Sequence, residues 1–231
     1  NGLAFDPDGR PARADLYPLP AAVAARYPTL VRRLAGDFDL QVGEITPDAE
    51  AYIAYRHALT PMQTAQLDLD FDELGQYVHG THVAGIASRG NAGARLVVSR
   101  FDDELDGTLP FAPSVAWAQR MNANFAAVGA YFRANRVRVV NCRWGDTVAE
   151  FEEWTAKRST IAEPAARKAF AERLYRMWRT AVERTIEAAP DTLFVVAAGN
   201  ANTSASFIGD VPSSFTTPNV LVVGAVDQAG D

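Results

Sequence analysis

Short apolar runs alternate with long helical segments in the second half of the chain, and this alternation constrains the fold more than any other feature. The apolar runs, rich in valine and leucine, lie at residues 96–98, 137–142, 193–198 and 220–226. Helical segments at 112–135 and 164–189 lie between them, and the second opens with Pro164. Its apolar side chains recur about 3.6 residues apart, at Phe170, Leu174, Trp178, Ala181, Val182 and Ile186. Apolar strands that alternate with helices are typical of a parallel sheet. We therefore predict an α/β fold with a parallel β-sheet sandwiched between helices.

The composition indicates a globular protein whose partners are not nucleic acids. The chain has 231 residues, a hydrophobic fraction of 48% and a formal net charge of −6. It therefore lacks the basic surface that a phosphate backbone requires. No apolar run approaches the roughly 20 residues that cross a bilayer. We expect no nucleic-acid or membrane partner, and one domain is the default for this length.

The first 75 residues differ from the rest of the chain. Alanine-rich helical pieces lie at 21–35 and 49–59, and prolines at 18, 20, 28, 47 and 61 restrict where helices start or continue. We expect helices and loops at a surface there.

Metal sites find little support in the sequence. The one cysteine, Cys142, excludes an internal disulfide and a cysteine-rich metal cluster. An acidic run that could bind calcium contains Asp68, Asp70, Asp72 and Glu73. The regular ligand spacing and the glycine of a calcium loop are missing, so a solvated face is the favoured interpretation. We predict no cofactor and keep calcium as the alternative.

The segment from Val78 to Ser88 contains two of the three histidines in the chain. Glycine, threonine and small residues follow His79, which predicts a helix start with the imidazole presented at its mouth. In one interpretation His79 and His82 share a zinc ion, with His57 or a nearby aspartate as a further ligand. In another, both histidines are structural. We do not favour zinc, because neither a His-Glu-x-x-His pattern nor a second ligand pair is present.

Polar residues at the ends of two predicted strands mark the place where chemistry is expected. Asn141 and Asn200 both follow apolar runs. In parallel sheets the functional groups gather at the carboxyl ends of the strands, where the loops open a crevice. These two asparagines are therefore candidates for a functional site.

Four motifs, in the family's order, resemble those of the subtilase family of serine peptidases. Residues 79–84 (His-Gly-Thr-His-Val-Ala) resemble the histidine motif, and 139–141 with Gly145 resemble the substrate-binding strand. Residues 195–200 (Val-Val-Ala-Ala-Gly-Asn) resemble the oxyanion-hole segment, and 218–227 resemble the strand that follows it. The four motifs together are far more specific than any one of them.

The resemblance implies a subtilisin-like sheet and a serine endopeptidase that hydrolyses peptide bonds through a Ser-His-Asp triad. His79 would be the general base, and Asn200 would donate from its side chain to the oxyanion. The positions expected to bind substrate are Arg143, Trp144, Gly145, Ala198 and Gly199. The implied partner is a peptide or protein substrate, and a secreted or periplasmic location is typical of the family. The oligomeric state is left open.

Two members of the implied triad are not found within the chain. No Gly-Thr-Ser segment followed by small residues occurs, so the serine is expected downstream of Asp231. The opening Asn1-Gly2-Leu3 fits the residues that follow the family's aspartate, which is therefore expected immediately before Asn1. We interpret residues 1–231 as a single truncated peptidase domain with insertions around 10–75 and 146–163.

The residues after Asn141 depart from the family pattern. That pattern has a small residue, often serine, and then an aliphatic residue before the glycine, whereas Cys142, Arg143 and Trp144 stand here. Successive strand side chains point to opposite faces, so either Arg143 or Trp144 is expected to shape the substrate cleft. A guanidinium in the cleft would favour acidic substrates, and the alternative is a solvated arginine. Cys142 is interpreted as a small buried apolar residue.

Two functions from different classes follow from these observations. The first is an active serine endopeptidase, whose serine and aspartate are expected outside residues 1–231, so that these residues alone are expected to be inactive. The second is a catalytically inactive subtilase fold used for binding or as a scaffold. The unusual substrate strand and the missing triad members keep the second open.

Overall fold

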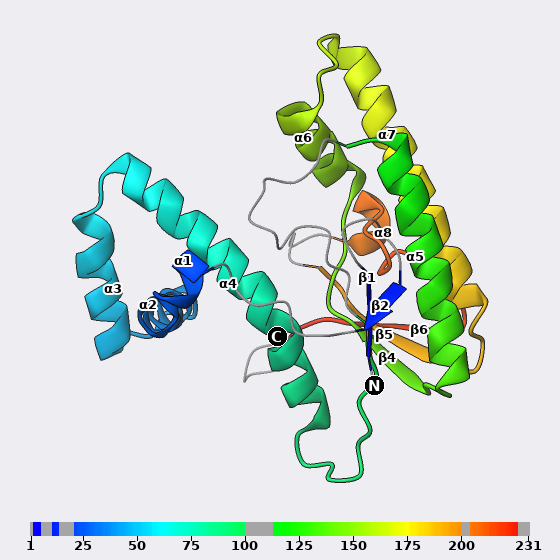
Figure 1. Ribbon diagram of the computed structural model, residues 1–231, viewed down its shortest axis with the longest axis horizontal. Helices are drawn as coiled ribbons and strands as arrows, with labels where there is room; N and C mark the ends of the chain where they lie inside the picture. Colours follow the sequence, from blue (N-terminus) through cyan, green and yellow to red (C-terminus); the bar gives the residue numbers. More distant parts are fainter. Residues whose placement is uncertain (1, 6–10, 14–20, 100–112, 200–203, 226–231) are drawn as a thin grey trace. The chain divides into compact units, whose positions relative to one another are not determined.

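The computed structural model describes residues 2–5, 11–13, 21–99, 113–199 and 204–225 (Figure 1). The chain divides into two compact units. The α/β unit consists of Asn1–Asp15, Arg95–Glu104 and Leu109–Asp231. The helical unit consists of Leu16–Ala94 and Leu105–Thr108. The interpretation of the whole chain as one domain with insertions stays a prediction.

Helices and strands are distributed unequally between the two units. The helical unit contains α1 (Ala21–Ala24), α2 (Tyr27–Gln41), α3 (Pro47–His57) and α4 (Pro61–Ser88). The α/β unit contains β1 (Gly2–Phe5), β2 (Pro11–Arg13), β3 (Val98–Ser99), α5 (Val115–Ala134), β4 (Val139–Cys142), α6 (Val148–Arg158), α7 (Pro164–Glu187), β5 (Leu193–Ala197), α8 (Ala205–Ile208) and β6 (Val220–Val223). None of the helices in the described ranges combines the length and the apolar character needed to span a membrane.

The strands of the α/β unit form two three-stranded sheets. In one sheet β4, β5 and β6 are parallel, with β5 in the centre. Val139 pairs with Leu193, and Phe194 pairs with Val220. In the other sheet β1 lies between β2, which is antiparallel to it, and β3, which is parallel. The small parallel sheet and its connecting helices agree with the predicted α/β class.

Capping residues fix the starts of α5, α6 and α7 in the α/β unit. The side chain of Ser114 accepts a hydrogen bond from a backbone N–H three residues on, at 3.1 Å, and α5 begins there. Thr147 and Glu150 form a capping box before α6. α7 begins after Glu163 with Pro164 in its first turn, as the sequence predicts.

One face of the parallel sheet packs against α5 and α7, which lie side by side (Figure 1). Cys142, Phe194 and Val196 point to this face and are buried. The buried apolar residues that α7 contributes include Leu174, Trp178, Ala181, Val182 and Ile186. They are five of the six residues predicted from helical spacing, and the sixth, Phe170, is partly buried. Removal of this apolar surface from water, at about 25 cal/mol per Å², holds the helices to the sheet.

The opposite face of the parallel sheet carries exposed apolar side chains. Val139 is 57% exposed, Leu221 is 50% exposed and Val223 is 44% exposed. Along β4, Val139 alternates with partly buried and buried residues, as the pleat requires, whereas β6 contains no buried residue and its Val222 is 40% exposed. The predicted sandwich, with helices on both faces of the sheet, stays a prediction.

The helical unit has a smaller core. Leu30 of α2 and Leu74 of α4 are fully buried, together with Tyr52 of α3. The guanidinium of Arg26 binds both carboxylate oxygens of the buried Asp70, with Nη2 to Oδ1 at 2.9 Å. Beyond Leu74, no described side chain of α4 is buried. The helical character predicted for residues 21–35 and 49–59 is confirmed, with a break between α1 and α2.

Candidate active site

Two segments that carry predicted substrate-binding residues leave the parallel sheet at the same edge. β4 and β5 are parallel neighbours whose last residues pair in register. Gly145 therefore follows β4 at the edge where Ala198 and Gly199 follow β5. The backbone N–H of Ala198 donates to the Val223 carbonyl at 3.0 Å, which fixes this end of β5 against β6.

Gly145 and Gly199 both face the side chain of Asp210. A β-carbon on Gly145 would lie 3.1 Å from Asp210 Oδ1 and 2.7 Å from the Val211 carbonyl oxygen. A β-carbon on Gly199 would lie 3.3 Å from Asp210 Oδ2, and the φ of +94° at Gly199 favours glycine. Asp146 and Val211 form an antiparallel bridge that holds the two segments together. Two glycines predicted to bind substrate therefore flank one carboxyl group.

The loop that carries Asp210 is fastened to α7. The Tyr175 hydroxyl donates a hydrogen bond to the Gly209 carbonyl. Nη1 of Arg179 donates to Ser214 Oγ at 2.8 Å. These bonds lie on both sides of Asp210, so the position of its carboxyl group is set by a helix that packs on the sheet.

Asp210 is a buried carboxyl group with a raised pKa. Its exposed fraction is 7%, and the Ser213 hydroxyl donates to its Oδ2. Burial raises the pKa of Asp210 because the charged form loses hydration, and the Ser213 hydrogen bond opposes this shift. The negative charge of Glu150 raises the pKa of Asp210 further, whereas a hydrogen bond from the backbone of Val211 lowers it. Perturbed carboxyl groups of this kind cluster at functional sites.

The sequence analysis did not single out Asp210. Its position depends on contacts with two strand ends that lie far from it in the sequence. The available local signal was an aspartate after a glycine, in the loop between two predicted strands, and such residues are common in turns.

Trp144 and Arg143 lie in different environments. The Trp144 ring is 5.6 Å from the Phe125 ring and 6.1 Å from the Trp178 ring, measured between centroids. It is anchored on α5 and α7 and remains 38% exposed. Arg143 is exposed. This exposure is compatible with a cleft residue and with a solvated one, so the roles of Arg143 and Trp144 in substrate binding stay predictions.

Cys142 is buried beneath the helices. Its exposed fraction is 3%, and burial raises the pKa of its thiol to about 12. The thiolate needed for nucleophilic attack is therefore scarce at neutral pH. The interpretation of Cys142 as a small buried apolar residue is confirmed.

His79 lies well inside α4, so the prediction of a helix start at this residue was wrong. The N-terminus is set much earlier by the capping box of Thr60 with Gln63, and the helix continues through the His-Gly-Thr-His segment. His79 and His82 are both exposed. His79 belongs to the helical unit, whereas Gly145, Ala198, Gly199 and Asp210 belong to the α/β unit.

Asn200 lies outside the described residues, and its donation to an oxyanion stays a prediction. Asn141, the other polar candidate, lies in β4 and is exposed. Gly199, the residue before Asn200, is the last described residue at this end of β5.

The acidic run on α4 is partly engaged in ion pairs. Asp70 binds Arg26, and Asp68 Oδ1 lies 3.6 Å from Arg56 Nη1. The side chains of Asp72 and Glu73 lie outside the described part of the chain. Within the described ranges, no group of three or more histidine, cysteine, aspartate or glutamate side chains is arranged to hold a metal ion.

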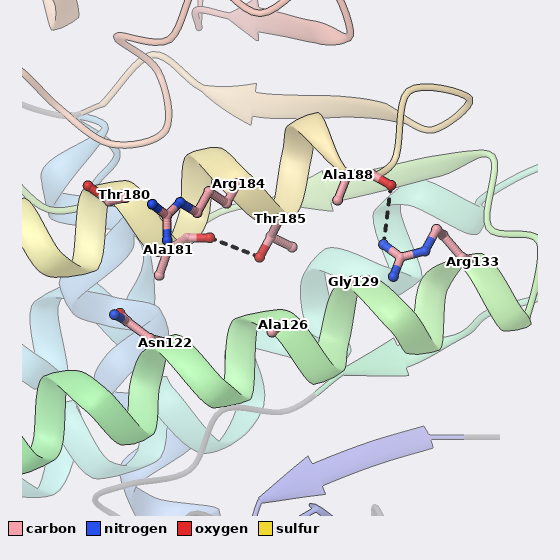
Figure 2. Close-up of a pocket in the computed structure, with 9 residues that line it drawn as sticks. All are labelled: Asn122, Ala126, Gly129, Arg133, Thr180, Ala181, Arg184, Thr185 and Ala188. Carbon is pink, nitrogen blue, oxygen red and sulfur yellow. Dashed lines mark hydrogen bonds between the residues drawn. The ribbon is translucent and has the colours of Figure 1, made fainter.

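A groove of about 310 Å³ between α5 and α7 is a separate concave surface (Figure 2). Nη1 of Arg133 donates to the Ala188 carbonyl at 3.2 Å, and the Thr185 hydroxyl donates to the Ala181 carbonyl at 2.9 Å. These bonds satisfy groups of the two helices themselves, and none of the predicted site residues lines the groove. We therefore locate the candidate site at the strand ends around Asp210.

Comparison with known proteins gives one match. A sequence model of the subtilase family matches residues 46–231. The matched range includes both the His-Gly-Thr-His segment and the strand ends around Asp210. Searches of curated proteins and of solved structures found no match.

Proposed function

Because the chain belongs to the subtilase family, we propose that it forms the central part of a serine endopeptidase domain, with His79 as general base and Asn200 as oxyanion donor. The nucleophilic serine and the aspartate that orients His79 are proposed to lie outside residues 1–231, since no Gly-Thr-Ser segment occurs among them. The substrates are peptides or proteins, in a secreted or periplasmic location, and no cofactor is required.

The arrangement of strand ends around Asp210 is the main structural support for this proposal. The pairing of β4 with β5 brings Gly145 to the same edge of the sheet as Ala198 and Gly199. Glycine permits a close approach of another backbone, and an extended peptide substrate needs such an approach on both sides. Asn200 follows Gly199 directly, so its amide is proposed to act at the same edge.

The proposed reaction is acyl transfer through a covalent intermediate. His79 takes the proton of the serine hydroxyl as the serine oxygen attacks the scissile carbonyl carbon. A C–O bond forms, the carbonyl oxygen becomes an oxyanion, and the Asn200 side-chain N–H donates to it. His79 then gives the proton to the amine nitrogen as the C–N bond breaks. Water hydrolyses the acyl-enzyme through the same proton transfers and regenerates the serine.

Labelling of the full-length protein with a fluorophosphonate tests this proposal, because the reagent reacts with activated serines. The folded wild-type protein is expected to be labelled. His79→Ala is expected to lose labelling, since the serine loses its general base. His82→Ala is the matched control, because His82 is equally exposed on the same helix, and it should keep labelling.

A catalytically inactive subtilase fold used for binding is the alternative function. Its support is the bulk of Arg143 and Trp144 after β4, where the family pattern has smaller residues. A folded wild-type protein that takes no label would favour this alternative. The flanking coding sequence gives an independent check, since the proposal requires an aspartate before Asn1 and a Gly-Thr-Ser segment after Asp231.

A further inference from the structure

One face of α2 in the helical unit is apolar and exposed. Val31 is 40% exposed, Phe38 is 55% exposed and Val42 is 74% exposed, and Ala35 between them is exposed as well. Val42 continues the path of the helix, because its backbone N–H donates to the Phe38 carbonyl at 3.1 Å. These four residues, which we call the α2 seam, form an apolar line along the helix. Exposed apolar surface that is continuous in this way marks an interaction site.

The α2 seam is not needed to hold α2 in its own unit. Leu30, on another side of the helix, is fully buried in the core of the unit. Gly36 lies directly against the backbone of Asp48 at the start of α3, where a β-carbon would have no room. The guanidinium carbon of Arg33 lies 3.4 Å from the Tyr55 ring centroid. The contacts that fix α2 therefore lie away from the seam, and polar substitutions in the seam should leave the unit folded.

The spacing of the α2 seam is that of a contact between two helices. Successive residues of the seam are four, three and four positions apart. This alternation is the pattern of the core positions in a two-helix coiled coil, and it keeps one face turned toward a partner helix. The partner that fits the seam is therefore another helix, which crosses at a small angle and contacts it along its length.

A second copy of α2 that runs in the opposite direction fits the seam by size. A two-fold axis between positions 35 and 38 would place Phe38 of each copy opposite Ala35 of the other. The same axis would place Val31 of each copy opposite Val42 of the other. The largest side chain of the seam thus meets the smallest, so the two faces can close without a gap.

The charges beside the α2 seam fit the same arrangement. Arg32 and Asp39 each follow a seam residue by one position, so they lie on the same side of the seam. The two-fold axis would bring Arg32 of each copy to Asp39 of the other, and one carboxylate oxygen of Asp39 already accepts from the Thr46 hydroxyl. A parallel arrangement would instead place Arg32 and Asp39 beside the uncharged Tyr27 and Leu34. The charges therefore favour the antiparallel direction.

We propose that the α2 seam is a dimer interface, and that its occupant is the α2 seam of a second copy of this chain in the antiparallel direction. The fifteen residues of α2 give a seam of about 22 Å. Such a seam buries less surface than the roughly 1,200–2,000 Å² of a standard interface. The dimer is therefore expected to dissociate with a Kd on the order of 10 µM. This inference does not depend on the proposed peptidase function.

The first experiment is sedimentation velocity of the full-length protein from about 1 to about 100 µM, a range that spans the expected Kd. The wild-type protein is expected to pass from monomer to dimer. Phe38→Glu should stay monomeric throughout, because it places an unpaired charge in the middle of the seam. Met62→Glu is the matched control, since Met62 is an 83% exposed apolar residue of α4 in the same unit, and this variant should still dimerise. Circular dichroism checks that each variant is folded.

The second experiment reverses the charges beside the seam. Arg32→Glu and Asp39→Lys should each raise the Kd about tenfold, because each variant alone brings like charges together in its own dimer. An equimolar mixture of the two variants should dimerise again, since one copy then supplies two carboxylates and the other supplies two cations. The chain that carries both substitutions should also dimerise as the wild type does. A variant that merely failed to fold would not regain dimerisation in the mixture.

Three outcomes would overturn the proposal. A wild-type protein that is monomeric at about 100 µM has no such interface at the expected strength. A dimer that survives Phe38→Glu forms through another surface. A dimer that is lost in Phe38→Glu but is not recovered by the mixed charge variants has a different direction from the one proposed. Neither experiment measures catalysis, so failure of the dimer leaves the peptidase proposal standing, and absence of fluorophosphonate labelling leaves the dimer standing.

Discussion

The α/β unit and the helical unit carry different candidate residues, and those residues have different surroundings within their own units. In the α/β unit, the predicted substrate segments end on strands that lie beneath α5 and α7, and Asp210 is tied to α7 through its neighbours. In the helical unit, the proposed general base stands on a stretch of α4 in which no described side chain is buried. The predicted substrate-binding segments thus lie on a packed core, and the proposed proton acceptor lies on an exposed helix.

The predicted substrate-binding segments and the proposed general base are therefore held in place by different kinds of contact. A residue on a packed scaffold is held by many contacts, so its position resists change. A residue on an exposed helix is held mainly by the helix itself. Mutations in the two units should therefore affect different parts of the molecule.

The largest effect is expected from matched leucine substitutions in the two cores. Leu174 of α7 and Leu74 of α4 are both fully buried, so Leu174→Ala and Leu74→Ala each remove the same side chain from a filled site. Each should cost about 2–5 kcal/mol of unfolding free energy. Hydrogen exchange should rise in residues 113–199 for Leu174→Ala and in residues 21–88 for Leu74→Ala. An equal rise of hydrogen exchange in both ranges for either variant would contradict separate stabilities for the two units, because the units would then unfold together.

A pair of glycine substitutions is expected to give effects of opposite sign. A β-carbon on Gly145 would meet the Val211 carbonyl oxygen at 2.7 Å, so Gly145→Ala should destabilise the protein by about 1–3 kcal/mol. Gly75 lies inside α4 with no atom within 4 Å of its β-carbon position. Gly75→Ala should therefore stabilise by about 0.5–1 kcal/mol. Urea unfolding followed by circular dichroism measures both, and a neutral Gly145→Ala would show that the strand ends tolerate a shift.

The smallest effect is expected in the pH dependence of stability around Asp210. Its pKa is raised on folding, so the folded state holds this proton more tightly than the unfolded state does. The unfolding free energy should therefore fall as pH rises from the ordinary aspartate range through the raised pKa, and level off above it. The Ser213 and Val211 hydrogen bonds oppose the shift and keep the effect small.

Asp210→Asn should remove this fall. Unfolding free energies of the wild type and the variant, compared at a series of pH values, isolate the contribution of Asp210, because every other ionisable group is present in both proteins. Asp191→Asn is the control with an exposed carboxyl group. A wild-type-to-variant difference that does not change with pH would contradict the raised pKa.

The fold of the α/β unit was largely predictable, because its periodic patterns are local. The spacing of Leu174, Trp178 and Ile186 on α7 identified the buried face, and Pro164 identified the start of the helix. The length of α4 was missed for a physical reason. The glycine, threonine and small residues that follow His79 suggested a helix start there, whereas the capping box at Thr60 sets the start much earlier.

The candidate site was predictable only in part. Gly145 and Gly199 follow apolar runs that were predicted to be parallel strands. The carboxyl ends of parallel strands lie at the same edge of a sheet, so both glycines could be expected there. Asp210 could not be placed in this way. Its environment depends on the Asp146–Val211 bridge and on hydrogen bonds from α7. These contacts join segments that lie far apart in the sequence, so no local pattern predicts them.

Because Cys142 is buried, the alkylation rate of its thiol can measure how often the α/β unit opens. It is the one thiol in the chain, and it lies under α5 and α7 with a pKa raised to about 12. An alkylating reagent at neutral pH can reach it only when the helices separate from β4, so the labelling rate reports how often that opening occurs. A peptide bound across the strand ends would slow the labelling rate in proportion to the fraction of protein molecules to which it is bound. No reporter group has to be added to the protein.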